Sequence, residues 1–290
     1  MKKFALFLVF VVFCVSACKG EKIKSSNANV ENLNSSPNFV NAEKSGNIEE
    51  SEKTKNAQKQ KLVIEILKKL NLPSANFIQQ NLSEFLIEFE EVYTNDKDYL
   101  LVLVDKTHHL PKTYKPEDLV SLSSNDYYSV SRNDLSLRIP VENALRLMAK
   151  EALKENVWLL VSSTFRSYEY QEKLFARWVE IDGLEEAERS SARAGTSQHQ
   201  LGTAIDFGSI DDSFAETKAG KWLEKNAENY GFSLSFPQGY ENVTGYRWEC
   251  WHYRYIGVEA CKLQKKWFNN IQQYMMEFID AWERNGGNNL

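Results

Sequence analysis

The 290-residue sequence has little of several features that mark particular classes of protein. Four cysteines are too few for a scaffold held together by disulfides. Basic residues are not in excess, because 35 Lys and Arg stand against 40 Asp and Glu, for a formal net charge of −5. Binding to nucleic-acid phosphates depends on a basic face, so this balance argues against a nucleic-acid partner. The hydrophobic content of 42% is close to that of globular proteins and indicates a chain that is not disordered throughout.

The apolar run from Phe4 to Ala17 is too short to cross a bilayer core, which takes about 20 residues. It follows a basic start, Met1-Lys2-Lys3, and the combination is typical of a secretory signal peptide over residues 1–17. The run ends in V-S-A-C at Cys18, which resembles the lipobox of bacterial lipoproteins. This resemblance implies a lipidated Cys18 and an exported, membrane-anchored lipoprotein that faces the periplasm or the cell exterior. An ordinary signal peptide followed by a chance cysteine is the alternative.

The composition of the remaining chain predicts three regions. Residues 18–60 are rich in Asn, Ser, Lys and Glu and cannot bury enough surface to offset their ordering entropy, so we expect a flexible tether. From residue 61 to 95, apolar residues recur at helical spacing, and Pro73 separates two predicted helices. Residues 96–285 carry the remaining apolar patterns and are predicted to form one catalytic domain with a C-terminal helix.

The domain region mixes short strands and helices in an irregular order. Continuous apolar runs at Tyr99–Asp105 and Val157–Val161 predict two buried strands. One helix is expected after Pro140, another after Ser167 as its N-cap, and a last one across Trp267–Trp282. The residues expected on the buried face of the helix after Ser167 are Tyr170, Leu174 and Trp178. This mixture predicts an α+β fold.

Two of the four histidines lie in stretches that also carry carboxylates. His199 belongs to S-Q-H-Q-L-G-T-A-I-D, which ends at Asp206, and His252 ends E-C-W-H, which begins at Glu249. Two imidazoles and one carboxylate are a plausible ligand set for catalytic zinc, which keeps a fourth position for water. Glu249 is then the candidate for an unligated base. Residue types alone also fit a second interpretation, in which the histidines are hydrogen-bonded core residues and Asp206 accepts in a turn.

The spacing of Glu249 and His252 sets a geometric condition on such a site. In a regular strand, residues three apart point to opposite faces of the sheet. Both side chains can therefore reach one metal only if the chain turns or bulges near Cys250 and Trp251.

Two motifs resemble those of the LAS metallopeptidases, namely S-x-H-x-x-G-x-A-x-D over residues 197–206 and E-x-W-H over 249–252. They are most similar to the D-alanyl-D-alanine carboxypeptidases of the VanY type. Further stretches follow in family order, among them S-T-F-R-S-Y-E-Y-Q over 163–171 and G-K-W-L over 220–223, so the resemblance covers about residues 98–257. It implies a single LAS-type domain in which helices flank a small, mainly antiparallel sheet.

The resemblance also implies a role for each residue of these motifs. His199, Asp206 and His252 would bind Zn²⁺, and Glu249 would be general base and acid for hydroxide attack on the scissile peptide carbonyl. The residues expected to hold substrate are Arg166, Gln171 and Ser197. Three interactions are open for Arg166. It could bind the terminal carboxylate of the substrate, stabilise the oxyanion that forms during the reaction, or pair with a carboxylate of the protein. The implied reaction removes the terminal D-alanine from peptidoglycan stem peptides, and the protein is expected to be a monomer.

Two other functions stay open on the sequence alone. One is an L,D-carboxypeptidase that acts on tetrapeptide stems with the same zinc apparatus. The other is a non-catalytic lipoprotein that binds wall peptides or a partner, although a binding protein has no need of the base Glu249. Two residues depart from the family pattern, because Cys250 stands where proline is common and Phe165 replaces the commoner tyrosine. Three roles are open for Cys250: an extra metal ligand, an easily oxidised thiol, or a small apolar side chain that fills space, which we favour. A disulfide between Cys250 and Cys261 also stays open.

Overall fold

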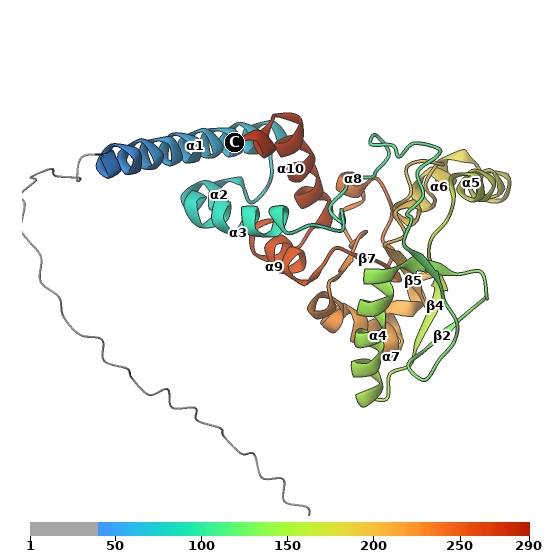
Figure 1. The fold of residues 1–290 in the computed structure, drawn as a ribbon. Helices are drawn as coiled ribbons and strands as arrows, with labels where there is room; N and C mark the ends of the chain where they lie inside the picture. Colours follow the sequence, from blue (N-terminus) through green and yellow to red (C-terminus); the bar gives the residue numbers. More distant parts are fainter. Residues whose placement is uncertain (1–39) are drawn as a thin grey trace, which may run out of the picture. The chain divides into compact units, whose positions relative to one another are not determined.

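The computed structural model describes the backbone from residue 40 and side chains from residue 52 (Figure 1). The predicted signal peptide, Cys18 and the tether up to residue 39 therefore lie outside the described residues. From residue 40 to 60 the structure differs from the predicted tether, because helix α1 spans Val40–Leu70. The Glu, Lys and Gln residues that suggested a tether also have high helix propensity. The chain divides into two compact units after residue 48, and the second, Glu49–Leu290, holds the elements that follow α1.

The end of α1 packs with four further helices around one hydrophobic core. They are α2 (Ala75–Gln80), α3 (Leu82–Thr94), α9 (Val258–Trp267) and α10 (Gln272–Arg284). Phe85 is buried in this core, where its ring lies edge-on to Trp267 and Phe278, with centroids 5.4 and 5.2 Å away. The predicted break at Pro73 is confirmed, because it falls between α1 and α2. None of the helices described from residue 40 onward is long and apolar enough to span a membrane.

Five short strands form the central sheet in the order β2-β4-β5-β7-β6. They are β2 (Tyr128–Val130), β4 (Leu159–Ser163), β5 (Ala204–Phe207), β6 (Phe232–Leu234) and β7 (His252–Tyr255). Only β2 and β4 pair in parallel, which confirms the predicted mainly antiparallel sheet. A separate antiparallel pair joins β1 (Leu119–Ser121) to β3 (Ser136–Arg138). With its flanking helices, this arrangement confirms the predicted α+β fold.

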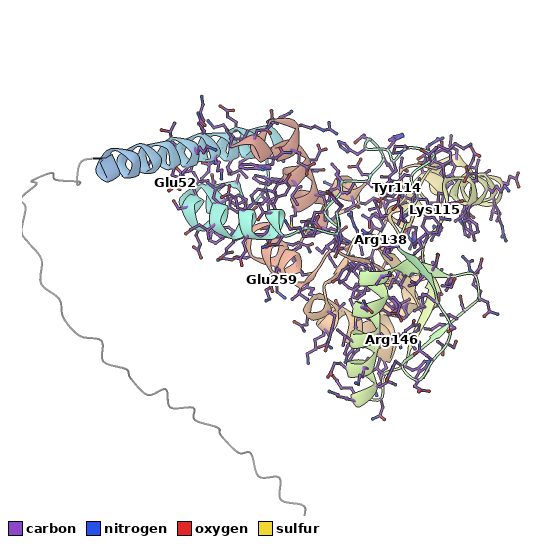
Figure 2. The ribbon with its side chains drawn as sticks, in the orientation of Figure 1. Glu52, Tyr114, Lys115, Arg138, Arg146 and Glu259 are labelled. Atoms are coloured by element: carbon purple, nitrogen blue, oxygen red, sulfur yellow. The ribbon has the colours of Figure 1, made fainter. Side chains whose placement is uncertain are left out.

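One face of the central sheet is covered by α4 (Ile139–Lys154) and α7 (Lys218–Asn226), which share its hydrophobic core. On the outer side of α4, Arg146 (Figure 2) forms an ion pair at 2.6 Å with Glu142, one turn earlier in the helix. Ile205 of β5 and Tyr253 of β7 point into the core. Because side chains alternate along a strand, their neighbours Asp206 and His252 point to the opposite face. The functional site is built on that face.

The prediction of a buried strand at Tyr99–Asp105 is wrong, because this segment belongs to no sheet. Its apolar residues are nevertheless buried, as Leu101 and Val104 show. The carbonyls of Leu100 and Val102 accept hydrogen bonds from Nη2 of the buried Arg254, at 2.6 and 2.8 Å. Arg254 of β7 thus gives these two carbonyls the hydrogen bonds that a neighbouring strand was expected to supply.

The N-cap of helix α5 (Tyr168–Asp182) is confirmed, because Ser167 Oγ accepts from the backbone N–H of Tyr170. The predicted buried face of α5 is wrong, since Tyr170 and Trp178 are 41% and 38% exposed. Instead, Gln171 and Phe175 are buried. An apolar helix face that lines an open cleft has the same periodicity as one that faces a core, so the sequence pattern does not separate the two.

The predicted C-terminal helix is interrupted. Trp267 ends α9, and α10 begins only at Gln272. Asn269 and Asn270 both have positive φ, of 52° and 60°, in the left-handed region that breaks a helix. From residue 40 onward, the helical elements not yet named are α6 (Leu184–Ser190), α8 (Glu241–Thr244) and the 3₁₀ turns η1 (Gln198–Leu201), η2 (Asp212–Glu216), η3 (Ala227–Tyr230) and η4 (Gly287–Asn289).

Candidate metal centre and active-site cleft

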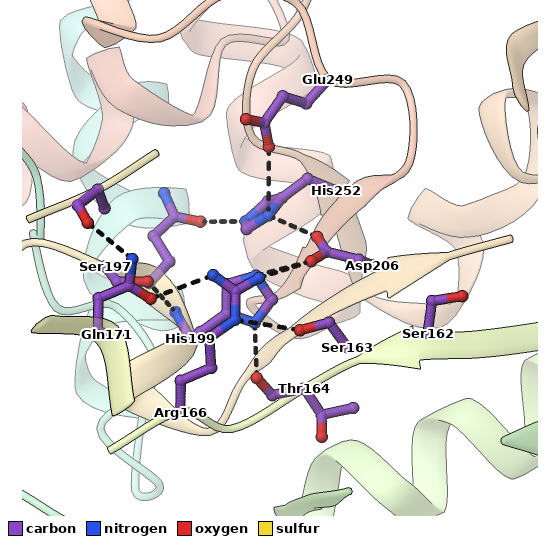
Figure 3. Close-up of polar contacts among 12 residues, drawn as sticks. Ser162, Ser163, Thr164, Arg166, Gln171, Ser197, His199, Asp206, Glu249 and His252 are labelled. Carbon is purple, nitrogen blue, oxygen red and sulfur yellow. Dashed lines mark hydrogen bonds and ion pairs between the residues drawn. The ribbon is translucent and has the colours of Figure 1, made fainter. Parts of the chain in front are cut away.

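The structure brings His199, Asp206 and His252 together on the open face of the sheet (Figure 3). Asp206 and His252 are opposite each other in the antiparallel register of β5 and β7, so their side chains share one face. His199 comes from η1, just before β5, where Ser197 Oγ caps the turn by accepting from its backbone N–H. One ligand atom from each residue lies within 4.8 Å of the others, and all three residues are buried.

One ring nitrogen of each histidine faces Asp206. His199 Nδ1 lies 2.7 Å from the carbonyl of Thr164 and donates to it, so Nε2, 3.2 Å from Asp206 Oδ2, is free to accept. His252 Nδ1 lies 2.9 Å from Asp206 Oδ1, and its Nε2 lies 3.2 Å from Gln198 Oε1, which can accept the ring proton when Nδ1 binds a cation. Two imidazole nitrogens and a carboxylate thus converge, an arrangement that a cation stabilises. The donor set fits zinc, which takes three protein ligands in catalytic sites.

The electrostatics of His199 and Asp206 are suited to metal binding, because metal ligands must be deprotonated. Burial, together with the charge of Arg166, lowers the pKa of His199 to about 4. Burial by itself would raise the pKa of Asp206, but the two histidines hold it well below its ordinary value. At neutral pH, His199 is therefore a neutral imidazole and Asp206 a carboxylate.

Glu249 lies beside this group through a tight turn. The backbone N–H of His252 donates to the carbonyl of Glu249 at 3.1 Å, which closes a turn over Cys250 and Trp251. The turn predicted from the spacing is therefore confirmed, and it puts Glu249 Oε2 3.7 Å from His252 Nδ1. Burial and the charge of Asp206 raise the pKa of Glu249 well above its ordinary value. A buried carboxyl next to a ligand set is a suitable place for a general base.

Arg166 connects the metal ligands to the start of α5. Its Nη2 donates to Asp206 Oδ2 at 2.8 Å and to His199 Nε2 at 3.0 Å. Its other nitrogens donate to Gln171 Oε1 and Ser163 Oγ, each at 3.1 Å. Gln171 is fully buried and holds Arg166 rather than lining the cleft, whereas Ser197 lines it. In this structure Arg166 pairs with a carboxylate of the protein, the third of the options that the sequence left open.

Cys250 lies away from the ligands. Its Sγ approaches the carbonyls of Asp211 and Asp212, at 3.7 and 3.8 Å, and its side chain belongs to the sheet's hydrophobic core. Burial raises the pKa of its thiol, which keeps the less reactive protonated form. Cys250 and Cys261 are both free. The role of small apolar filler is therefore confirmed.

The ligand group lies in a cleft of about 480 Å³. Tyr170, Leu174 and Trp178 of α5 form an apolar stretch of its lining, and the charged side chains of Arg132 and Arg247 also reach it. Sequence reasoning missed this role of α5, and it missed Gln198, which contacts His252. The sequence gives no signal for Gln198, because it occupies a variable position of the S-x-H-x-x-G-x-A-x-D motif.

Comparisons with known proteins agree with this geometry. A family model described as "VanY: D-alanyl-D-alanine carboxypeptidase" matches residues 134–258. The putative carboxypeptidase YodJ of Bacillus subtilis (strain 168) is 30% identical over 226 residues, which cover 72% of this chain and 83% of YodJ. A D-alanyl-D-alanine carboxypeptidase of Enterococcus faecium is 27% identical over 201 residues, which cover 68% of this chain and 62% of the relative.

Solved structures also resemble the fold. The LdcB LD-carboxypeptidase is 31% identical with a TM-score of 0.54, and the match covers 64% of this chain and 88% of LdcB. VanYB in complex with D-alanine-D-alanine is 28% identical with a TM-score of 0.51, and the match covers 63% of this chain and 98% of VanYB. A VanY variant in complex with Zn(II) is 28% identical with a TM-score of 0.50, and the match covers 62% of this chain and 98% of the variant. The chain therefore belongs to the VanY family of D-alanyl-D-alanine carboxypeptidases and is a zinc metallocarboxypeptidase.

Proposed function

We propose that this protein removes the terminal D-alanine from peptidoglycan stem peptides, with His199, Asp206 and His252 as its zinc ligands. The observation that carries the proposal is the convergence of two imidazole nitrogens and a carboxylate beside the buried Glu249, which lies outside that group. The complex of VanYB with D-alanine-D-alanine supports the substrate class. Zinc bound at this site supplies a Lewis acid and lowers the pKa of a coordinated water.

The chain's own residues carry the proton transfers. Glu249 accepts the proton of the attacking water as the new C–O bond forms, and its raised pKa favours holding that proton. It then gives the proton to the departing amine when the peptide C–N bond breaks and D-alanine leaves. Burial excludes bulk water from the carboxyl, so the proton is returned to the leaving group rather than lost to solvent.

The test is mass spectrometry of pentapeptide and tetrapeptide muropeptides incubated with the protein, with and without a chelator. Loss of one alanine from the pentapeptide, abolished by the chelator and restored by zinc, is the expected result. The second candidate, L,D-cleavage, is supported by the 31% identity to the LdcB LD-carboxypeptidase. Shortening of the tetrapeptide instead would assign that activity. Cleavage of neither substrate by zinc-loaded protein would contradict both.

Arg166 is proposed to bind the terminal carboxylate of the substrate. Nη2 of Arg166 lies among the atoms proposed to bind the metal. A cation bound there would compete with Nη2 for Asp206, which would free an N–H of Arg166 to bind an anion. Arg166→Lys keeps the charge but loses the planar fork, and kcat/KM is expected to fall about 100-fold while zinc binding is retained. Steady-state kinetics decide the role: a rise in KM indicates carboxylate binding, whereas a fall in kcat alone assigns Arg166 to the oxyanion.

The apolar stretch of α5 is proposed to contact the part of the peptide that precedes the scissile bond. Trp178→Ala removes an aromatic surface from the cleft and is expected to raise KM for a pentapeptide about 10-fold, with little change for a blocked D-alanyl-D-alanine dipeptide. Trp158→Ala, at an exposed tryptophan outside the cleft lining, is the matched control. Equal effects of Trp178→Ala on both substrates would show that α5 does not bind the stem.

We further propose that the protein is exported and anchored through a lipid on Cys18, which would place it on the side of the membrane where peptidoglycan lies. The support is the sequence of residues 1–18. The mass of the N-terminal peptide isolated from membranes tests it, because a lipidated Cys18 must be its first residue.

A further inference from the structure

Arg132 follows the edge strand β2 and reaches the active-site cleft. It precedes residues 134–258, the part of the chain that matches the family model. The backbone N–H of its neighbour Ser131 donates to the carbonyl of Val161 at 2.9 Å, which holds the start of this loop against β4. The position of Arg132 is therefore set by the same sheet that carries two of the proposed zinc ligands.

The guanidinium of Arg132 lies against the ring of Tyr170 on α5. Its Cζ is 5.6 Å from the ring centroid, and its Nη1 donates to the Tyr170 hydroxyl at 3.2 Å. Both side chains line the cleft. This contact between a cation and an aromatic face, together with the hydrogen bond, holds the guanidinium at the cleft wall.

The two side chains have more hydrogen-bond donors than acceptors. Among the residues that the structure describes, the guanidinium makes a hydrogen bond only through Nη1. Its Nε lies 2.8 Å from Oδ1 of Asp134 without forming a hydrogen bond, and the Asp134 side chain is 68% exposed, so solvent screens this ion pair. A hydroxyl that accepts from a guanidinium also keeps its own proton to donate. Nη2 of Arg132 and the Tyr170 hydroxyl can therefore donate to a carboxylate in the cleft.

The other arginines of the cleft lining have closer partners. Arg166 donates to the buried Asp206 at 2.8 Å, and Arg247 donates to both carboxylate oxygens of Asp212. Arg132 differs from them because its contact with a carboxylate is not a hydrogen bond. It is therefore the cleft arginine whose N–H groups are most available to a substrate.

The remaining acidic residues of the lining lie far along the cleft wall from Arg132. Asp182 comes 12 residues after Tyr170 on α5, which is about 18 Å along the helix axis. Glu186 of α6 accepts from Arg189 at 2.8 Å. Neither of these carboxylates therefore neutralises Arg132.

The distance from Arg132 to the metal centre suits a residue upstream of the scissile bond. Strand β2 is separated from β5, which carries Asp206, by β4 alone. Two strand spacings amount to about 10 Å, and an extended peptide covers about 3.3 Å per residue. A pentapeptide whose scissile carbonyl lies at the metal therefore brings its second or third residue within reach of Arg132, whereas its terminal carboxylate stays close to the metal.

We propose that Arg132, together with the hydroxyl of Tyr170, binds a carboxylate of the stem peptide upstream of the scissile bond and so selects among stems. The inference rests on the proposed function. Two carboxylates have the required chemistry and position. One is the α-carboxylate of a γ-linked glutamate as the second residue, and the other is the side-chain carboxylate of diaminopimelate as the third residue.

The test is kcat/KM of the zinc-loaded, full-length protein on four pentapeptides that differ by one carboxylate at a time. The second residue is γ-linked glutamate or its α-amide, and the third is diaminopimelate or lysine. At one of these positions the unchanged protein is expected to prefer the carboxylate about 10-fold, the size of one charge-assisted hydrogen bond, and that position identifies the source. Arg132→Ala is expected to remove the preference, and Arg132→Lys, which keeps the charge, to retain part of it.

Arg177→Ala is the matched control, because Arg177 is exposed on the same helix as Tyr170 but does not line the cleft. It is expected to keep the preference, and an equal loss in Arg177→Ala would overturn the inference. The inference would also be wrong if Arg132→Ala lowered kcat/KM equally on all four pentapeptides and on a blocked D-alanyl-D-alanine dipeptide. Arg132 would then act on a part that all the substrates share.

The unchanged protein separates this inference from the proposed function. If it cleaves the dipeptide and the pentapeptides without preference at either position, the proposed function stands and the role of Arg132 alone is refuted. If it cleaves none of these substrates, the proposed function is wrong and the inference falls with it.

Discussion

Glu249→Gln is expected to lower kcat about 10²- to 10⁴-fold while the protein still binds zinc. Glu249 lies outside the three converging residues that are proposed as ligands, and its Oε2 is 3.7 Å from His252 Nδ1. Glutamine has nearly the same shape but cannot accept a proton, so only the proton transfer is lost. Zinc content and turnover of the pentapeptide, measured on the same preparation, check both parts of the expectation.

The same variant makes a prediction about stability. Burial and the charge of Asp206 raise the pKa of Glu249 above its value in the unfolded chain, so the folded state binds this proton more tightly. The carboxyl therefore costs stability that grows as the pH rises above the unfolded pKa. Glutamine has no proton to lose, and the metal-free Glu249→Gln protein is expected to melt at a higher temperature than the unchanged chain at neutral pH, with the gap closing toward acid pH.

Glu277→Gln is the control for the loss of turnover. Burial also raises the pKa of Glu277, but this residue contacts Gln273 on α10 and does not line the cleft. It is expected to leave turnover unchanged. If Glu249→Gln kept full activity, Glu249 would not be the base, whatever its effect on melting.

The parts of the site that could be predicted from sequence are those determined by local spacing or contained in the motifs of the family resemblance. Asp206 and His252 meet because β5 and β7 pair in register, and each lies in a motif that the family resemblance identified. The turn over Cys250 and Trp251 followed from strand geometry, since Glu249 and His252 are three residues apart. The N-cap at Ser167 followed from its side chain and the apolar run behind it.

What the sequence does not reveal depends on contacts between distant residues. The run Tyr99–Asp105 has the composition of a buried strand, but the groups that bind its carbonyls belong to Arg254, more than 150 positions away. Trp178 has the spacing of a core residue, but the surface opposite it is a cleft. Gln198 has no pattern of its own in the sequence, because its contact with His252 is made between residues 54 positions apart.

Asp206→Asn is expected to weaken zinc binding more than about 100-fold, because loss of a direct ligand should exceed the cost of losing an outer partner. The change is isosteric, yet it replaces a charged ligand with a neutral amide at the centre of the convergent group. His199 and His252 would then face a neutral amide in place of the carboxylate. Chelator competition measures the loss directly, independently of any substrate.

The metal-free protein should also lose stability in Asp206→Asn. The pKa of Asp206 in the folded protein lies well below its ordinary value, so the carboxylate stabilises the fold at every pH above the pKa of the unfolded chain. This stabilisation is lost as the pH falls through the pKa of the folded state. Arg166 would keep its bonds to Gln171 and Ser163 but lose its carboxylate partner. Breaking such a buried pair costs on the order of 3 kcal/mol, to be measured by urea denaturation at neutral pH.

Asp212→Asn is the matched control, because Asp212 forms a paired contact with Arg247 at 2.7 and 2.8 Å on an exposed surface. Exposed pairs contribute at most about 1 kcal/mol, so its effect on stability should be small and zinc binding should not change. A loss of stability in Asp206→Asn without a loss of zinc affinity would mean that Asp206 serves only as the partner of Arg166. In that case the carboxylate would leave the ligand set, and the metal would have to be held by the two histidines and a different third group.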